Sequence, residues 1–96
     1  MRLLILPAAR ADLREIGDFI ASDNPARAAT FVAEIEARIG RIAAMPDASL
    51  ACDDLHPGLR SVRQARYGIF FTVEDDAVRI VRVIHDARDL RVAFRK

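Results

Sequence analysis

Arginine supplies most of the side chains in this sequence that can recognise another molecule. Fourteen of the fifteen basic residues are arginines, and the guanidinium fork binds carboxylate or phosphate through two parallel hydrogen bonds. Residues of opposite parity on a strand point to opposite faces, so the five arginines of the predicted strands and turns form no single stripe. They predict either a basic sheet face that binds carboxylates or phosphates, or solvated charges that protect a sheet edge. These five arginines are Arg60, Arg63, Arg66, Arg79 and Arg82.

The two histidines and the single cysteine offer little catalytic machinery. His85 ends an apolar run, where it can serve as a general acid in phosphodiester cleavage or as a structural hydrogen-bonding group. His56 lies in a loop without an evident partner, and Cys52 alone cannot form an internal disulfide. The sequence has no Ser-His-Asp arrangement, glycine-rich phosphate loop or metal-ligand spacing. We therefore expect no catalytic residue, no metal and no cofactor.

A helical periodicity follows the first six residues. Leu13, Ile16 and Ile20 form one apolar stripe, with Asp12 expected on the exposed surface. Asn24-Pro25 is a good helix start, and the second helix runs to Met45-Pro46 with Ala28, Phe31, Ile35, Ile39 and Ile42 on its apolar face. A connection this short predicts an antiparallel helical hairpin.

A strand periodicity flanks this hairpin. Residues 2–6 precede it, and residues 59–63, 67–73 and 77–85 follow a polar loop at 46–58. The connections between the last three segments are too short for crossovers, so these strands form an antiparallel meander. The order β-α-α-β-β-β predicts an α+β fold in which the hairpin packs on a small antiparallel sheet, with residues 1–96 as a single domain.

The composition narrows the class of protein and of partner. A chain of 96 residues with 52% hydrophobic and 30% charged residues is typical of one globular domain, not of a disordered tail or a membrane protein. Residues 1–57 carry six arginines and nine carboxylates, a balance of −3, whereas residues 58–96 carry nine basic residues and five carboxylates, a balance of +4. The basic half predicts an acidic partner. The first residues do not read as a signal peptide, so we expect a cytoplasmic protein.

The C-terminal segment is basic and amphipathic. Leu90 and Phe94 are four residues apart, with Arg91 and Arg95 beside them. These side chains either complete the core of a small domain or recognise another protein. Aromatic, aliphatic and arginine anchors carry most of the energy of protein interfaces, and the segment has no evident role in the core. We therefore expect Leu90, Arg91, Phe94 and Arg95 to bind a target.

Several segments, in this order and spacing, resemble the RelE/ParE toxin superfamily. Residues 11–16 and 24–31 resemble its two helices, and residues 57–61 and 67–71 resemble its strands. The ending at residues 79–89 is most similar to the ParE branch. The resemblance covers nearly the whole chain and implies the toxin of a bacterial type II toxin–antitoxin pair.

Within this superfamily, the resemblance to ParE implies a toxin that inhibits DNA gyrase by binding and has no enzymatic activity. RelE-like members instead cleave mRNA on the ribosome, commonly with an arginine after the aromatic residue of the middle strand. Here Gly68 follows Tyr67, which favours the gyrase inhibitor. A ribosome-dependent mRNA interferase is the alternative, and a partner-binding module that has lost its toxicity is a third reading.

The resemblance also implies a cognate antitoxin, ParD-like and itself DNA-binding, so that this chain meets nucleic acid only through its partners. We expect the antitoxin to lay apolar residues on the helical hairpin and carboxylates against Arg60, Arg63 and Arg79.

Overall fold

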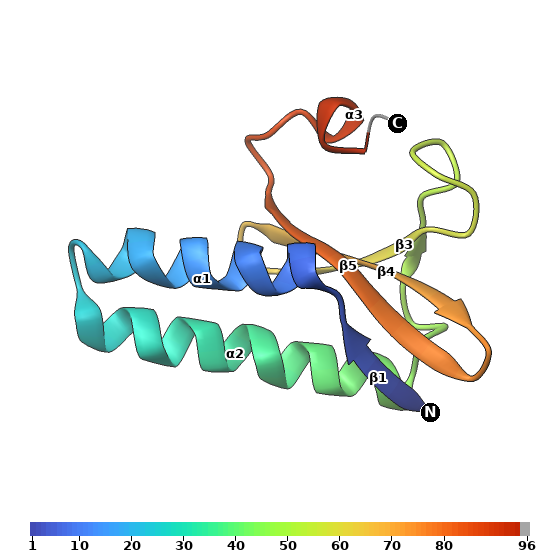
Figure 1. Cartoon of the computed structure of the whole chain (residues 1–96), viewed down its shortest axis with the longest axis horizontal. Coiled ribbons are helices and arrows are strands. Elements are labelled where there is room, and N and C mark those ends of the chain that lie inside the picture. Colours follow the sequence, from blue (N-terminus) through green and yellow to red (C-terminus); the bar gives the residue numbers. More distant parts are fainter. Residues whose placement is uncertain (95–96) are drawn as a thin grey trace.

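Two long helices form an antiparallel hairpin under one face of a sheet (Figure 1). The computed structural model describes residues 1–94. Helix α1 (Pro7–Ala21) and helix α2 (Pro25–Ala44) are joined by residues 22–24. The Asn24 side chain caps α2 by accepting the Arg27 N–H at 3.1 Å. The predicted stripes are confirmed, because their residues face the sheet and are buried or half-buried. Among residues 1–94, no helix combines the length and apolarity needed to cross a membrane.

Five strands form one sheet in the order β1-β5-β4-β3-β2. They are β1 (Arg2–Ile5), β2 (Leu50–Ala51), β3 (Arg60–Gln64), β4 (Tyr67–Glu74) and β5 (Ala77–His85). The predicted meander β3-β4-β5 is confirmed. Strand β1 pairs with β5 in parallel, which is possible because the whole hairpin lies within a connection long enough for a crossover. The short β2 interrupts the loop expected at 46–58.

The sheet buries a different cluster on each face, and neighbouring residues of β4 divide between them. Phe71, fully buried, faces the hairpin, whereas Phe70, 4% exposed, faces the opposite side. The larger cluster, which we call the inner core, consists of Ala9, Leu13, Ile16, Phe31, Ile35, Ile39, Ile42, Val62, Ile69, Phe71, Val78, Ile80 and Val83. The smaller one, the outer cluster, has three buried members, Leu59, Phe70 and Ile84.

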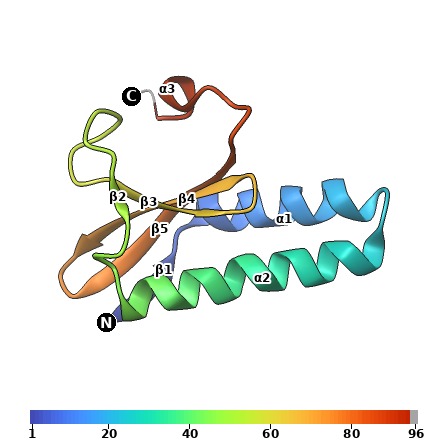
Figure 2. The ribbon, with the colours of Figure 1, turned by 180° about the vertical axis from the view of Figure 1, so that it is seen from behind.

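The C-terminal segment folds back over the outer cluster. Helix α3 (Leu90–Ala93) is a single turn capped by Asp89, whose side chain accepts the Arg91 N–H at 3.0 Å. Leu90 and Phe94 both pack against the outer cluster. The expectation that this segment has no role in the core is therefore wrong. Seen from behind, α3 and the loop after α2 lie on the side of the sheet opposite to the hairpin (Figure 2).

Candidate functional site

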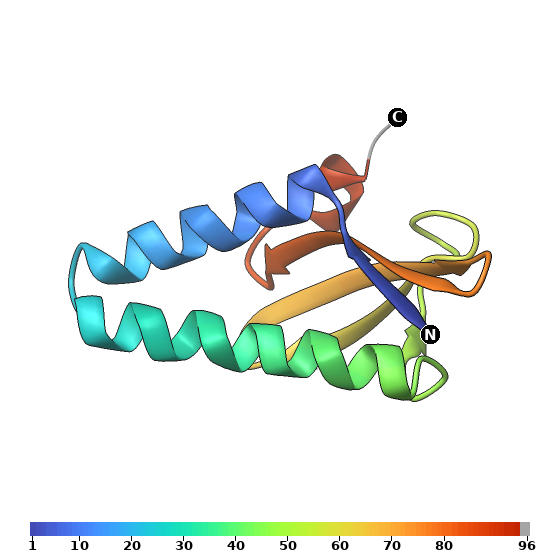
Figure 3. The same ribbon diagram turned by 60° about the horizontal axis from the view of Figure 1, so that its bottom comes forward.

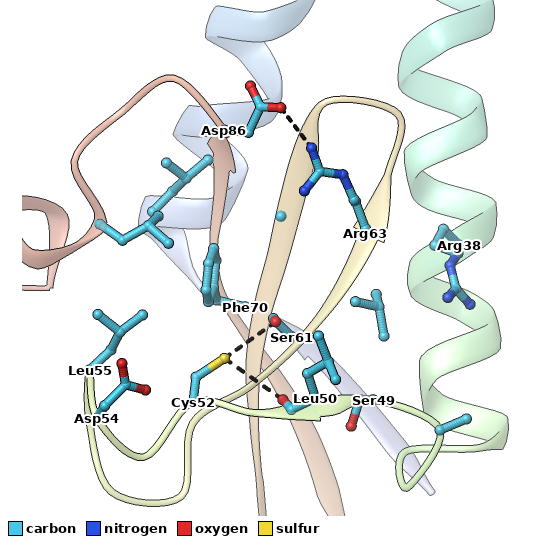
Figure 4. A pocket seen from close by; sticks show the side chains of 15 residues that line it. Arg38, Ser49, Leu50, Cys52, Asp54, Leu55, Ser61, Arg63, Phe70 and Asp86 are labelled. Atoms are coloured by element: carbon cyan, nitrogen blue, oxygen red, sulfur yellow. Dashed lines mark hydrogen bonds and ion pairs between the residues drawn. The ribbon is translucent and has the colours of Figure 1, made fainter.

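The outer face of the sheet carries a groove of about 700 Å³ between α3 and the loop that follows α2. We call it the outer groove. Gly68, Phe70 and Ile84 form its floor, the loop at 48–55 forms one wall, and Leu90 of α3 contributes to the other. Figure 4 shows Phe70 at the centre, with Cys52 and Leu55 on the loop side. The groove is thus the part of the outer face that neither α3 nor the loop covers, and its floor is apolar.

Gly68 leaves the space that the Phe70 ring occupies on the floor of the outer groove. A Cβ atom on this residue would lie 2.8 Å from Cε2 of Phe70, closer than carbon atoms approach. The Phe70 ring in turn meets the Phe94 ring edge-on, with 5.0 Å between the centroids. A larger side chain at position 68, such as the arginine of RelE-like sequences, would displace this ring. The packing of the outer cluster therefore favours glycine at position 68.

One end of the outer groove is polar. The Arg63 guanidinium donates to Asp86 at 2.6 Å and to the carbonyl of Ala65 at 3.1 Å. Nearer the loop, the Cys52 thiol lies 3.3 Å from the Ser61 hydroxyl. The Arg63 side chain remains 67% exposed despite its ion pair, so it can donate hydrogen bonds to a second carboxylate.

The structure does not gather the three arginines expected to bind an antitoxin. Arg60 pairs with Phe71 across the strands and donates to Ser49 at 2.6 Å, which fixes the loop after α2. Arg63 and Arg79 lie opposite positions 68 and 72 of β4, four residues or roughly 13 Å apart along the strand. Arg79 is 3.8 Å from the Glu74 carboxylate, and its Nε is buried without a hydrogen-bond partner in the described residues.

Asp12, expected on the surface, is buried and binds strand β5. Its carboxylate accepts two hydrogen bonds from Arg82, at 2.7 and 3.0 Å, and a third from the Val83 N–H at 2.8 Å. Strand β1 ends at Ile5, opposite Ile80, so β5 has a free edge beyond it and the carboxylate pairs the backbone there. The hydrogen bonds that Arg82 donates to Asp12 raise the pKa of Arg82 above its usual value. In the sequence, the position of Asp12 beside the apolar stripe was the one indication that its side chain is buried.

The pairing of β5 with β4 shifts by one residue next to Arg82. Phe70 pairs with Arg82, but Phe71 pairs with Ile80, so Val81 is an extra residue in β5. Such a bulge breaks the alternation of faces along the strand. The parity argument that places Arg79 and Arg82 on opposite faces therefore fails here, because it assumes an unbroken strand.

A second, smaller hollow of about 150 Å³ lies on the hairpin side of the sheet, and we call it the inner hollow. Its lining includes Ile16, Phe19, Val83, His85 and Arg88, together with Tyr67, whose ring meets His85 edge-on at 5.1 Å. Phe19 is 77% exposed, although it lies on the same helix as the buried stripe.

The Tyr67 and His85 rings contact each other, and His85 also contacts the turn after β5. Burial raises the pKa of Tyr67 above its usual value, so its hydroxyl keeps its proton at neutral pH. The His85 Nδ1 accepts the Ala87 N–H at 3.0 Å and lies 3.3 Å from the Asp86 carboxylate. This hydrogen bond shapes the turn that leads from β5 towards α3.

Of the residues expected to bind the target, two pack against the outer cluster and one is exposed. Leu90 and Phe94 are half-buried against the outer cluster, while Arg91 is exposed. Arg95 lies outside the described residues. Phe94 therefore holds the segment in place, and Arg91 is the described side chain of this set that is open to a partner.

Comparison with known proteins identifies the family. Residues 3–90 match the family model described as "ParE toxin of type II toxin-antitoxin system, parDE". The chain is 33% identical over 91 residues to Toxin ParE1 of Mycobacterium tuberculosis, in the strains CDC 1551 / Oshkosh and ATCC 25618 / H37Rv. The alignment covers 93% of this chain and 93% of the relative.

A solved structure has the same fold. The chromosomal ParDE system from P. aeruginosa contains a chain that matches with a TM-score of 0.78, over 88% of this chain and 95% of that one, at 22% identity. The family match spans most of the helices and strands that build the outer groove and the inner hollow. The chain belongs to the ParE toxin family and is the toxin component of a type II toxin–antitoxin system.

Proposed function

We propose that this toxin inhibits DNA gyrase by binding it and that it carries out no catalysis of its own. The observation that carries this proposal is the floor of the outer groove, where Gly68 and Phe70 fill the place of a phosphate-binding arginine. His85 adds support, because its Nδ1 accepts the Ala87 N–H in the turn after β5. The toxin then acts in the cytoplasm, through a protein surface.

Two assays with the purified toxin test this function. With gyrase, ATP and supercoiled plasmid, we expect cleaved DNA to accumulate as toxin is added. With translating ribosomes, we expect no site-specific cut in the mRNA. A ribosome-dependent cut that is lost in His85→Gln would support the interferase instead, because general acid catalysis contributes about 10²- to 10⁴-fold to a rate.

We also propose that a ParD-like antitoxin neutralises the toxin by laying an amphipathic, partly acidic segment in the outer groove. The apolar stripes of the hairpin are occupied by the sheet, so the apolar contact expected on the hairpin is moved to the groove. Arg63 at its polar end is the first candidate for the antitoxin carboxylates. Arg60 and Arg79 remain candidates outside the groove, because neither lines it. Leu90 lines the groove, so an antitoxin seated there abuts the C-terminal segment.

Charge reversal tests this assignment. We expect Arg63→Glu to weaken antitoxin binding about tenfold or more, equivalent to about 1.4 kcal/mol, and a reversed acid on the antitoxin to restore it. Arg41→Glu is the matched control, because Arg41 is exposed on α2 and does not line the groove. Unchanged affinity in Arg60→Glu, Arg63→Glu and Arg79→Glu would contradict the assignment.

The target contact is proposed at the C-terminal segment, through Leu90, Arg91, Phe94 and Arg95. Arg91 is exposed, so Arg91→Ala removes a candidate contact without loosening the outer cluster. We expect weaker growth arrest from this variant and unchanged thermal stability. Full toxicity of a folded chain that lacks residues 90–96 would place the target contact elsewhere.

A further inference from the structure

We propose that charges on the two sides of the outer groove fix the orientation of the antitoxin segment. Arg38, on the α2 side, binds a carboxylate of that segment, and Asp54, on the loop side, binds one of its cations. This inference rests on the antitoxin site proposed above and deepens it. It adds Arg38 to the arginines that bind the antitoxin, and it requires the acidic and basic residues of the segment to follow a fixed order.

Four charged residues line the outer groove, two of each sign. Arg63 and Asp86 neutralise one another through their 2.6 Å ion pair. Arg38 and Asp54, by contrast, make no ion pair within residues 1–94. The groove therefore keeps one cation and one carboxylate that the described part of the chain does not compensate.

The contacts along α2 explain why Arg38 is available. Glu34 precedes it by four residues, a spacing at which a glutamate and an arginine pair on one helix face. The Glu34 carboxylate instead accepts hydrogen bonds from Arg27, at 2.6 and 3.3 Å. Arg27 also lies over the Phe31 ring, 5.1 Å from its centroid. Glu34 is thus held towards the start of the helix, and the half-buried Arg38 lines the groove.

The two uncompensated charges lie on opposite sides of the groove. Helix α2 runs along the β3 side of the sheet, as Figure 3 shows, so Arg38 approaches the groove from beyond β3. In Figure 4, Phe70 stands between Arg38 and the exposed Asp54 of the loop after β2. The neighbouring Asp53 uses its carboxylate to accept the Gly58 N–H at 2.9 Å. A segment that crosses the apolar floor thus meets a cation on one side and a carboxylate on the other.

Charge complementarity then favours one orientation of the segment. The apolar floor contributes affinity in either direction, so the charges decide between the two. With its carboxylates at Arg38 and Arg63 and its cation at Asp54, the segment is attracted on both sides, whereas the reverse orientation places like charges together. A nucleic-acid strand does not fit this pattern, because its phosphates would face Asp54 and Asp86.

The first test reverses each charge and measures the affinity for the purified cognate antitoxin. We expect Arg38→Glu to lower the affinity about tenfold, and Asp54→Lys about threefold, because exposed ion pairs are the weaker ones. Arg41→Glu and Asp47→Lys are the matched controls, since both residues are exposed and neither lines the groove. Thermal unfolding shows that each variant is folded. Wild-type affinity in both groove variants, beside a loss in Arg63→Glu, would overturn the inference and leave the groove as the antitoxin site.

The second test uses Cys52, the single cysteine of the chain, which lies two residues before Asp54 on the loop wall of the groove. Single cysteines are placed along the groove segment of an otherwise cysteine-free antitoxin. A mild oxidant then joins neighbouring thiols of the complex in a disulfide. We expect cross-links from positions beside the basic residue of the segment and none from positions beside its carboxylates. Cys52→Ser is the control and should give no cross-link.

The cross-links separate the orientation from the antitoxin site on which it rests. Cross-links from positions beside the carboxylates would show the reverse orientation and overturn the inference, although the antitoxin would still occupy the groove. No cross-link from any position, together with wild-type affinity in Arg38→Glu and Arg63→Glu, would remove the antitoxin from the groove and overturn both proposals. The assays for gyrase and for mRNA cleavage are independent of either result.

Discussion

Phe70 and Phe71 are adjacent in β4 and belong to two different parts of the molecule. Phe71 faces two long helices in the inner core and has no exposed surface. Phe70 faces a one-turn helix and an open groove. The two side chains are chemically identical, so the difference between them lies entirely in what covers each face of the sheet.

The comparison shows how this domain divides stability from recognition. The inner face is closed by α1 and α2, whose apolar stripes match the strands below. The outer face is closed in part, by Leu90, Ala93 and Phe94, and the remaining apolar surface lines the groove. Apolar surface that stays open beside exposed charge is typical of a protein-binding site. The inner face therefore supports the fold, and the outer face is available to a partner.

The largest expected effect is the loss of Phe71. We expect Phe71→Ala to destabilise the domain by about 3–5 kcal/mol, which lowers the melting temperature by at least ~12 °C in a domain of this size. Phe70→Ala should cost clearly less, because α3 can move into the space. Thermal and urea unfolding measure both variants, and equal losses would contradict the distinction between the two faces.

Removal of the Asp12 carboxylate should have the next largest effect. Asp12→Ala leaves the Arg82 guanidinium and the Val83 N–H without their partner, and breaking a buried ion pair in this way costs about 3 kcal/mol. Urea unfolding checks this value. The double variant with Arg82→Met should recover part of the loss, since it removes the unpaired charge, and a purely additive double variant would argue against coupling.

A smaller loss is expected from Phe94→Ala, because Phe94 is half-buried. We expect about 2 kcal/mol, made up of lost apolar burial and the ring contact with Phe70. Limited proteolysis should then cut the C-terminal segment faster. Val92→Ala is the matched control in the same turn, because Val92 is 54% exposed and its truncation should leave the melting temperature unchanged. A protease pattern identical to wild type in Phe94→Ala would show that other contacts hold the segment.

The smallest effect is expected at Gly68. We expect Gly68→Ala to cost about 1 kcal/mol, since the new Cβ must push the Phe70 ring away from Phe94. The same substitution in a Phe70→Leu background should cost less, because the clashing ring atoms are absent. Melting temperatures of the four proteins test this double-mutant cycle, and an equal cost in both backgrounds would place the strain elsewhere.

The helices and the three-stranded meander were predictable because their signals are local. The apolar stripes of α1 and α2, the Asn24-Pro25 start and the short connections each lie within a few turns of chain. The parallel pairing of β1 with β5 was missed, because it joins segments from opposite ends of the sequence. The short β2 was missed as well, since a two-residue strand carries too little alternation to distinguish it from a loop.

The sequence by itself determined the order of the two long helices and the longer strands, the helical residues of the inner core and the resemblance to ParE, because periodicity and motif order are properties of the chain. Only the tertiary structure decided that Asp12 binds β5, that Phe94 meets Phe70 edge-on, and that Arg63 alone of the three predicted arginines lines the groove. The Asp12 contact lies beside a bulge at Val81 and beyond the point where β1 ends. Both are set by the packing of distant segments, which no local pattern records.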